Sequence, residues 1–285
     1  MKKLSLGYSP CPNDTFIFYA LAHKKVRGSL EFSETLRDVE TLNRMARSSE
    51  LDVTKVSFNA FGHLRDDYCL LRSGSALGRG CGPLIVAKKR INIEYLAGKT
   101  IAIPGKMTTA YLLLQLFDPG ITKVVEMPFD RIMNAVSLGT VDAGLIIHEG
   151  RFTYPKYGLL ELLDLGEWWE KETGLPIPLG GIIAKRSLGA DIINEVDRML
   201  KNSVEFAFAN RSMTRGYVRE HAQELDDEVI EQHIGLYVND YTLDIRDGIF
   251  AVEKLLNMAK RLNLIPYSDK HIFASTAAKY HQHRF

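Results

Sequence analysis

The 285-residue sequence has few cysteines and no apolar run long enough to cross a membrane. Its three cysteines, Cys11, Cys69 and Cys81, form no Cys-x-x-Cys pair, and an odd number of scattered thiols is typical of a reducing compartment. The apolar run near the N-terminus is too short for a signal-peptide core. We therefore expect a cytoplasmic protein with no membrane partner.

The sequence also lacks an excess of either charge, with 36 basic and 35 acidic residues. Without a long-range field of one sign, nothing attracts nucleic acid, and we expect no nucleic-acid partner. We find no internal repeat of fixed period and no low-complexity tract. The length allows one large domain or two of ordinary size around a sizeable core.

Short strand-like runs alternate with helical periodicity over the first half of the chain, which predicts an α/β architecture. Strands are expected at residues 4–8, 30–35, 51–57, 68–71 and 84–87, and again at 101–103, 123–127, 141–147 and 180–185. Helices are expected at residues 15–22, 39–48, 108–117 and 129–138, and the C-terminal third is almost entirely helical.

The pattern restarts after residue 98, which predicts a second lobe inserted into the first. We place the inserted lobe at residues 99–184 and the larger, discontinuous lobe at residues 1–98 and 185–285. Two lobes joined by two crossings describe the type II periplasmic-binding-protein-like fold, with the ligand cleft between the lobes. The alternative is a single doubly wound sheet without a hinge.

The segment Ser9-Pro-Cys-Pro-Asn-Asp-Thr15 separates an apolar strand from an apolar helix. Its two prolines end the strand, and Asn13 or Asp14 can cap the helix. Ligands bind at such strand-to-helix turns in open α/β sheets. The turn therefore predicts one wall of a small-molecule cleft, with an ordinary structural turn as the alternative.

A second strand end, Lys55-Val56-Ser57, places a hydroxyl at the start of the next helix. Ser57 can offer its hydroxyl and nearby N–H groups to a ligand. Capping alone would also explain a serine here.

The turn from Pro104 to Tyr111 places Thr108, Thr109 and several free amides at a helix start. Helix N-termini attract anions through unpaired N–H groups and the helix dipole. We predict a subsite for a substrate carboxylate or phosphate, with a bare cap as the alternative. The spacing differs from that of a P-loop.

His148 follows an apolar strand directly and precedes Glu149 and Gly150. A histidine at the carboxyl edge of a strand can reach a ligand and move protons near neutral pH. A structural histidine is the alternative. No second histidine completes a zincin HExxH motif, and we predict neither a metal nor a cofactor.

These motifs together, in this order, closely resemble the 1,4-dihydroxy-6-naphthoate synthase family of the futalosine route to menaquinone. The resemblance runs from the first strand to the C-terminal helices. It implies the two-lobed binding-protein fold and a lyase that converts cyclic dehypoxanthinylfutalosine into 1,4-dihydroxy-6-naphthoate.

The resemblance also implies roles for individual residues. His148 would be the general base that starts carbon–carbon cleavage. Ser57, with the backbone of Lys55 and Val56, would hold the substrate from the first lobe, and Thr109 with Ala110 would receive it in the second. We add Asn13 and Thr108 as candidate substrate-binding residues, and expect a small anionic molecule as the partner.

Two alternatives stay open at this point: a non-catalytic binding protein for an anionic metabolite, and the sister enzyme chorismate dehydratase. The sequence leaves open the oligomeric state, the extent of lobe closure and the group that protonates the leaving fragment. It also assigns no role to Asp14, Glu149 or Arg151.

Overall fold

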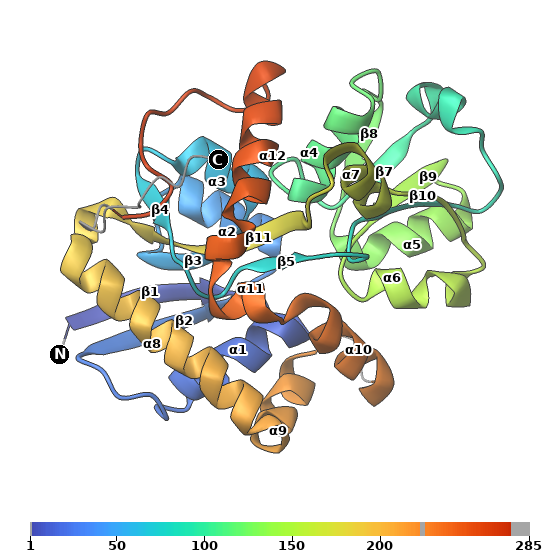
Figure 1. Ribbon diagram of the computed structural model, residues 1–285. Coiled ribbons are helices and arrows are strands. Elements are labelled where there is room, and N and C mark those ends of the chain that lie inside the picture. Colours follow the sequence, from blue (N-terminus) through green and yellow to red (C-terminus); the bar gives the residue numbers. More distant parts are fainter. Residues whose placement is uncertain (1, 223–225, 275–285) are drawn as a thin grey trace.

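The computed structural model describes residues 2–222 and 226–274, which form two α/β lobes side by side (Figure 1). Each lobe has its own sheet. The chain passes between the lobes twice, at residues 79–83 and 174–176. These two crossings connect the blue and orange first lobe with the green second lobe in Figure 1.

The first sheet has the strand order β2-β1-β3-β11-β4, with β5 paired to β11. Strand β1 runs parallel to β2 and β3, whereas β11 runs antiparallel to β3, β4 and β5. Its strands are β1 (Lys2–Tyr8), β2 (Leu30–Leu36), β3 (Val53–Ser57), β4 (Tyr68–Leu70), β5 (Ala76–Gly78) and β11 (Ile177–Lys185).

The second sheet has the order β10-β6-β9-β7-β8. Strands β7, β8 and β9 are parallel, and β6 is antiparallel to both of its neighbours. Its strands are β6 (Leu84–Ala87), β7 (Ile101–Ile103), β8 (Val124–Glu126), β9 (Ala143–Ile146) and β10 (Leu160–Asp164). The second sheet therefore presents the carboxyl ends of β7 and β9 at the same edge.

Helices cover both sheets. Those of the first lobe are α1 (Pro12–Ala22), α2 (Val39–Arg47), α3 (Phe58–Leu64), α8 (Ala190–Ala209), α9 (Arg211–His221), α10 (Asp227–Tyr237), α11 (Asp240–Leu243) and α12 (Ile249–Arg261). Those after the first crossing are α4 (Thr109–Phe117), α5 (Phe129–Leu138), α6 (Gly150–Thr153) and α7 (Leu165–Thr173). Short 3₁₀ helices occupy Ile93–Gly98, Tyr154–Tyr157, Arg186–Leu188 and Ile245–Gly248.

Local sequence explains where α2 begins. The side chain of Asp38 accepts hydrogen bonds from the N–H groups of Glu40 and Thr41, at 3.0 and 3.1 Å, which is a standard N-cap. Leu42 and Ala46, four residues apart, are fully buried against the first lobe. This anchoring fixes the face of α2 that looks toward the second lobe.

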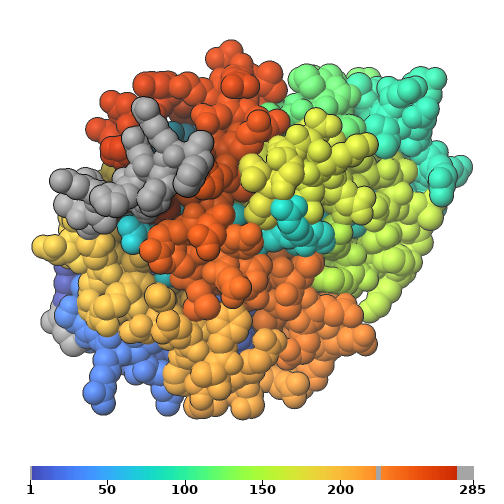
Figure 2. Space-filling model, in the orientation of Figure 1, coloured from blue at the N-terminus to red at the C-terminus, as the bar shows by residue number. Residues whose placement is uncertain are grey.

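The two lobes touch over a broad surface. Figure 2 shows the orange and red C-terminal helices of the first lobe reaching the green and yellow second lobe. Among residues 2–222 and 226–274, no helix is long and apolar enough to cross a membrane.

The predicted α/β, two-lobed fold is confirmed, and the presence of two separate sheets excludes a single doubly wound sheet. The predicted lobe boundaries at 98/99 and 184/185 differ from the way in which the strands divide between the two sheets. Strand β6 belongs to the second sheet, and β11 belongs to the first. A strand buried on both faces, as β6 is, gives no sequence signal of which sheet it joins.

Candidate active site

A cavity lies between the lobes, and residues from both lobes line it. It contains about 650 Å³ of empty space, which includes the open solvent at its mouth. Small-molecule sites are typically found at such boundaries between domains. All eight residues predicted from the sequence line it: Asn13, Lys55, Val56, Ser57, Thr108, Thr109, Ala110 and His148. The structure therefore brings together four motifs that are far apart in the chain.

Asp14 and Lys55 form a buried ion pair at the first-lobe side of this cavity. The Lys55 ammonium donates to Asp14 Oδ1 at 2.8 Å, and Ser9 donates to Asp14 Oδ2 from both its N–H and its hydroxyl. The predicted capping by Asn13 or Asp14 is wrong. Helix α1 begins earlier, with Pro12 in its first turn and Cys11 as N-cap, so both side chains lie inside the first turn.

Asn13 connects this ion pair to a histidine that sequence reasoning missed. Its Nδ2 donates to Asp14 Oδ1 at 3.0 Å, and its Oδ1 lies 3.0 Å from His233 Nε2. His233, on α10, is fully buried. The only sequence signal was a histidine among the apolar residues of a helix, which is also the pattern of an ordinary core residue.

Ser57 is the N-cap residue of α3, yet its side chain makes no capping hydrogen bond. Asn43 from α2 holds it instead: Asn43 Oδ1 accepts from the Ser57 N–H at 3.0 Å, and Asn43 Nδ2 donates to the Ser57 hydroxyl at 3.3 Å. Capping therefore does not explain this serine. Asn43, which sequence reasoning missed, fixes where the Ser57 hydroxyl lies on the cavity wall.

The two threonines at the second-lobe turn use their hydroxyls within the protein. Thr108 caps α4, because its hydroxyl accepts from the Tyr111 N–H at 3.2 Å and donates to the Gly105 carbonyl. The Thr109 hydroxyl donates to the Leu179 carbonyl at 2.6 Å. The first-turn N–H groups of Thr109 and Ala110 have no acceptor within the helix. These N–H groups, rather than the hydroxyls, are the donors that can receive an anion.

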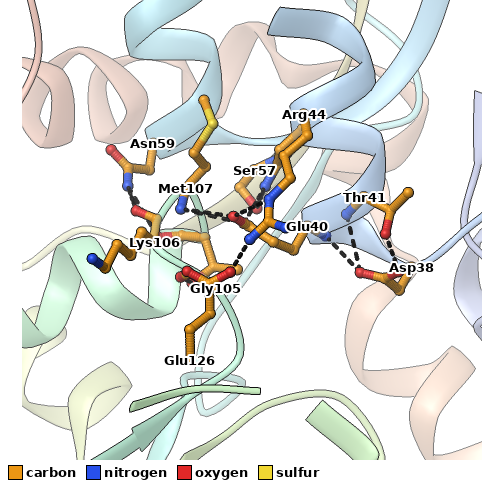
Figure 3. Close-up of polar contacts among 12 residues, drawn as sticks. Asp38, Glu40, Thr41, Arg44, Ser57, Asn59, Gly105, Lys106, Met107 and Glu126 are labelled. Atoms are coloured by element: carbon orange, nitrogen blue, oxygen red, sulfur yellow. Dashed lines mark hydrogen bonds and ion pairs between the residues drawn. The ribbon is translucent and has the colours of Figure 1, made fainter. Parts of the chain in front are cut away.

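This turn and the nearby strand β8 both contact the first lobe, as the close-up in Figure 3 shows. Asn59 Nδ2 donates to the Lys106 carbonyl at 3.1 Å, and the guanidinium of Arg44 pairs with Glu126. The lobes are therefore joined directly beside the cavity.

His148 follows β9 with a left-handed backbone, φ 55°. The residue is half-buried. The centroid of its ring lies 5.2 Å from that of Phe129 and 6.0 Å from that of His233, and its ring plane is within 8° of parallel to that of His233. Within the described part of the chain, neither of its ring nitrogens has a hydrogen-bond partner.

Burial lowers the pKa of His148 to about 4, with Lys55 acting in the same direction and Asp14 and Asp38 opposing. The imidazole is therefore neutral near pH 7 and can accept a proton.

Two residues that the sequence left without a role, Glu149 and Arg151, do not line the cavity, whereas two residues that were not predicted do line it. Arg151 pairs with Asp164 at 2.6 Å and does not line the cavity, nor does Glu149. Tyr237 of α10 and Gly82 of the first crossing do line it. Among the residues that the structure describes, no cluster of three or more histidine, cysteine, aspartate or glutamate side chains could hold a metal ion.

Two lobes, two sheets and a cavity between them define an α/β protein with a periplasmic-binding-protein-like fold. Solved structures agree. The ligand-binding component of an ABC-type import system from Staphylococcus aureus matches with a TM-score of 0.70 at 13% identity, covering 96% of this chain and 97% of that one. The alkanesulfonate-binding protein from Xanthomonas axonopodis pv. citri matches with a TM-score of 0.68 at 15% identity, covering 94% and 95%. At these identities the likeness shows the fold alone.

Closer relatives show the family. The sequence profile described as menaquinone biosynthesis matches residues 4–261, and this chain belongs to that family. It is 50% identical to the 1,4-dihydroxy-6-naphthoate synthase of Thermus thermophilus, over 96% of this chain and all of that protein. It is 49% identical to the synthase of Streptomyces coelicolor, over 92% of this chain and 95% of that protein. A crystal structure of a protein from Archaeoglobus fulgidus matches with a TM-score of 0.88 at 42% identity, covering 92% and 98%.

Proposed function

We propose that this chain is a 1,4-dihydroxy-6-naphthoate synthase, a carbon–carbon lyase acting on cyclic dehypoxanthinylfutalosine in menaquinone biosynthesis. The observation that carries the proposal is the near-complete coverage of two curated synthases at about half identity. The interlobe cavity supports it, because the residues that the resemblance assigned to substrate all line that cavity. A small anionic molecule is the proposed partner.

His148 is the proposed general base. Its lowered pKa leaves it neutral, and its two ring nitrogens carry no hydrogen bond to the described protein, so one of them can take a proton from the substrate. The electron pair left on the substrate forms a new π bond as the adjacent carbon–carbon bond breaks. The electrons of the broken bond leave with the departing fragment, which then takes up a proton, and aromatisation of the product favours the step. General-base catalysis contributes about 10²- to 10⁴-fold, so orientation supplies the rest.

The substrate would be oriented from both lobes. The N–H groups of Thr109 and Ala110 at the start of α4 suit a carboxylate. The Ser57 hydroxyl, held by Asn43, and the backbone of Lys55 and Val56 face it from the first lobe. The contacts that join the lobes beside the cavity would limit the access of water to the bound substrate.

We also propose a cytoplasmic location. The three cysteines are buried and unpaired, which is typical of proteins from a reducing compartment.

The test is incubation of purified protein with cyclic dehypoxanthinylfutalosine, without added metal or cofactor, followed by mass spectrometry. We expect 1,4-dihydroxy-6-naphthoate from the wild type and from His271→Gln, an exposed histidine outside the cavity. We expect a loss of at least 10²-fold for His148→Ala. Unchanged activity of His148→Ala would refute the proposed base. Intact substrate with the wild type would favour a binding protein, and turnover of chorismate would favour the sister dehydratase.

A further inference from the structure

His233 lies behind the proposed base and has two contacts that suit a supporting role. Its ring stacks on that of His148, and its Nε2 meets the carboxamide of Asn13. It has no exposed surface and does not line the cavity, so it cannot touch a ligand directly. Any effect of His233 on the reaction is therefore indirect, through the groups it contacts: His148, Asn13 and Tyr237, whose ring centroid lies 4.6 Å from its own.

The hydrogen bonds around Asn13 determine which nitrogen of His233 carries the proton. Asn13 uses its Nδ2 to donate to Asp14, which leaves its Oδ1 as an acceptor. His233 Nε2 must therefore be protonated. A neutral imidazole then has a bare lone pair on Nδ1, and that atom is buried without a hydrogen-bond partner among the described residues. A second proton on His233 would be buried without an acceptor, so the site disfavours the cation.

Burial and the surrounding charges both disfavour a cationic His233. Desolvation is the main cause that lowers the pKa of His233 well below the ordinary value, and the charges of His148 and Lys55 lower it further. The charged groups facing His148 are Asp14 of α1, Lys55 of β3 and Asp38 before α2. Asp14 and Lys55 neutralise each other as an ion pair. His233 thus presents a neutral ring to His148.

His148 needs such support because no hydrogen bond orients it. A base histidine is commonly held by an acceptor on its second ring nitrogen, which fixes the tautomer and the ring plane. His148 has no such partner within residues 2–222 and 226–274. Its ring is instead enclosed by Phe129 on α5 and His233 on α10.

We propose that His233 is a positioning residue with two separable functions: its ring encloses the ring of His148 on the side of α10, and its Nε2–H fixes the carboxamide of Asn13 at the cavity wall. The inference rests on the proposed function, in which His148 is the base and Asn13 contacts the substrate. The ring of His233 acts on His148, and the N–H of His233 acts on Asn13 of α1.

Two substitutions separate the functions. His233→Phe keeps an aromatic ring of similar size and removes the N–H donor. His233→Gln keeps an N–H donor that can reach Asn13 and removes the ring. The matched control is His271→Gln, which makes the same chemical change at an exposed position.

The first readout is the titration of His148 by NMR in protein with isotope-labelled histidine, assigned from the spectrum of His148→Gln. We expect a midpoint near pH 4 in the wild type. The midpoint should stay there in His233→Phe. In His233→Gln water reaches the ring, and the midpoint should rise by roughly one to two pH units toward the ordinary value of about 6.5.

The second readout is kinetic. The loss of one hydrogen bond to Asn13 should raise KM in His233→Phe by about five- to tenfold. The pH at which kcat/KM falls on the acid side should stay as in the wild type. His233→Gln should show the reverse: kcat/KM falls at a higher pH, and KM stays near that of the wild type. Equal His148 midpoints in the two variants would overturn the ring function, and an unchanged KM in His233→Phe would overturn the hydrogen-bond function.

The wild type provides a test that needs no variant. The ¹⁵N shifts of His233 should show a proton on Nε2 alone at pH 7, and a proton on Nδ1 would overturn the inference even if neither variant folds. The NMR experiments also need no turnover. Failure of the wild type to convert the substrate would therefore refute the proposed function while the His148 midpoints still decide the inference on His233.

Discussion

The carboxylate of Glu40 in the first lobe accepts a hydrogen bond from the backbone N–H of Met107 in the second lobe, at 3.2 Å (Figure 3). Glu40 is buried, which raises its pKa, while hydrogen bonds from Asn43 and Met107 and the charge of Arg44 oppose that rise. Asn43 in turn holds Ser57. The Glu40 side chain thus connects the contact between the lobes, at Met107, to the position of the Ser57 hydroxyl, which is a proposed substrate-binding group.

Removing this contact should weaken substrate binding more than it slows the chemical step. Glu40→Ala deletes the acceptor for the Met107 N–H and the anchor of Asn43, so we expect KM to rise about tenfold. Glu40→Gln keeps an acceptor oxygen and should change KM by less than about threefold. Steady-state kinetics measure both, beside Glu172→Ala on the exposed face of α7. A tenfold rise in the control as well would show that the effect is not specific to this contact.

Gly105 leaves room for the Glu40 carboxylate and should not tolerate a side chain. Its φ is 153°, and a Cβ atom there would lie 2.3 Å from Glu40 Cδ. We expect Gly105→Ala to lower the free energy of unfolding by roughly 1–3 kcal/mol.

The control for Gly105 is Gly158→Ala, where φ is also positive but nothing lies within 4 Å of the added atom. Chemical denaturation of the two single variants and of Gly105→Ala with Glu40→Ala separates the collision from the backbone strain. If the double variant is no more stable than expected from adding the single effects, the collision with Glu40 is not the cause.

The Asp14–Lys55 pair is the most deeply buried ion pair at the site, with Asp14 1% and Lys55 6% exposed. Lys55→Met leaves a carboxylate buried without its counter-charge, and we expect a loss of about 3–5 kcal/mol in the free energy of unfolding. Lys55→Met combined with Asp14→Asn leaves no unpaired charge and should recover part of that loss. Denaturant titrations of the single and double variants measure it, with the exposed Lys201→Met as control. A double variant no more stable than Lys55→Met would mean that lost packing, not the unpaired charge, destabilises the single variant.

Sequence patterns located the strand ends that meet at the cavity because each is a local feature. A strand that stops before a proline, a threonine pair or a histidine can be seen within about ten residues, and His148 and Thr109 were predicted in this way. The residues that were missed depend on contacts between distant segments. His233 lies 220 positions from Asn13, and nothing near either residue indicates the other. Asn43 was missed for the same reason, since its role follows from the packing of α2 on β3.

The lowered pKa of His148 has a direct consequence for the pH dependence of catalysis. A general base works only in its unprotonated form, so activity is lost as the pH falls through the pKa of that base in the free enzyme. Because desolvation lowers this pKa to about 4, kcat/KM should stay level from pH 8 down to about pH 5 and fall tenfold per pH unit below about pH 4. An unperturbed histidine would place this limb near pH 6.5. The measurement is kcat/KM between pH 3.5 and 8 with a parallel check that the protein stays folded. A limb at pH 6.5 would show that the His148 ring is hydrated in the free enzyme, and that closure on the substrate, rather than the fold alone, makes it a neutral base.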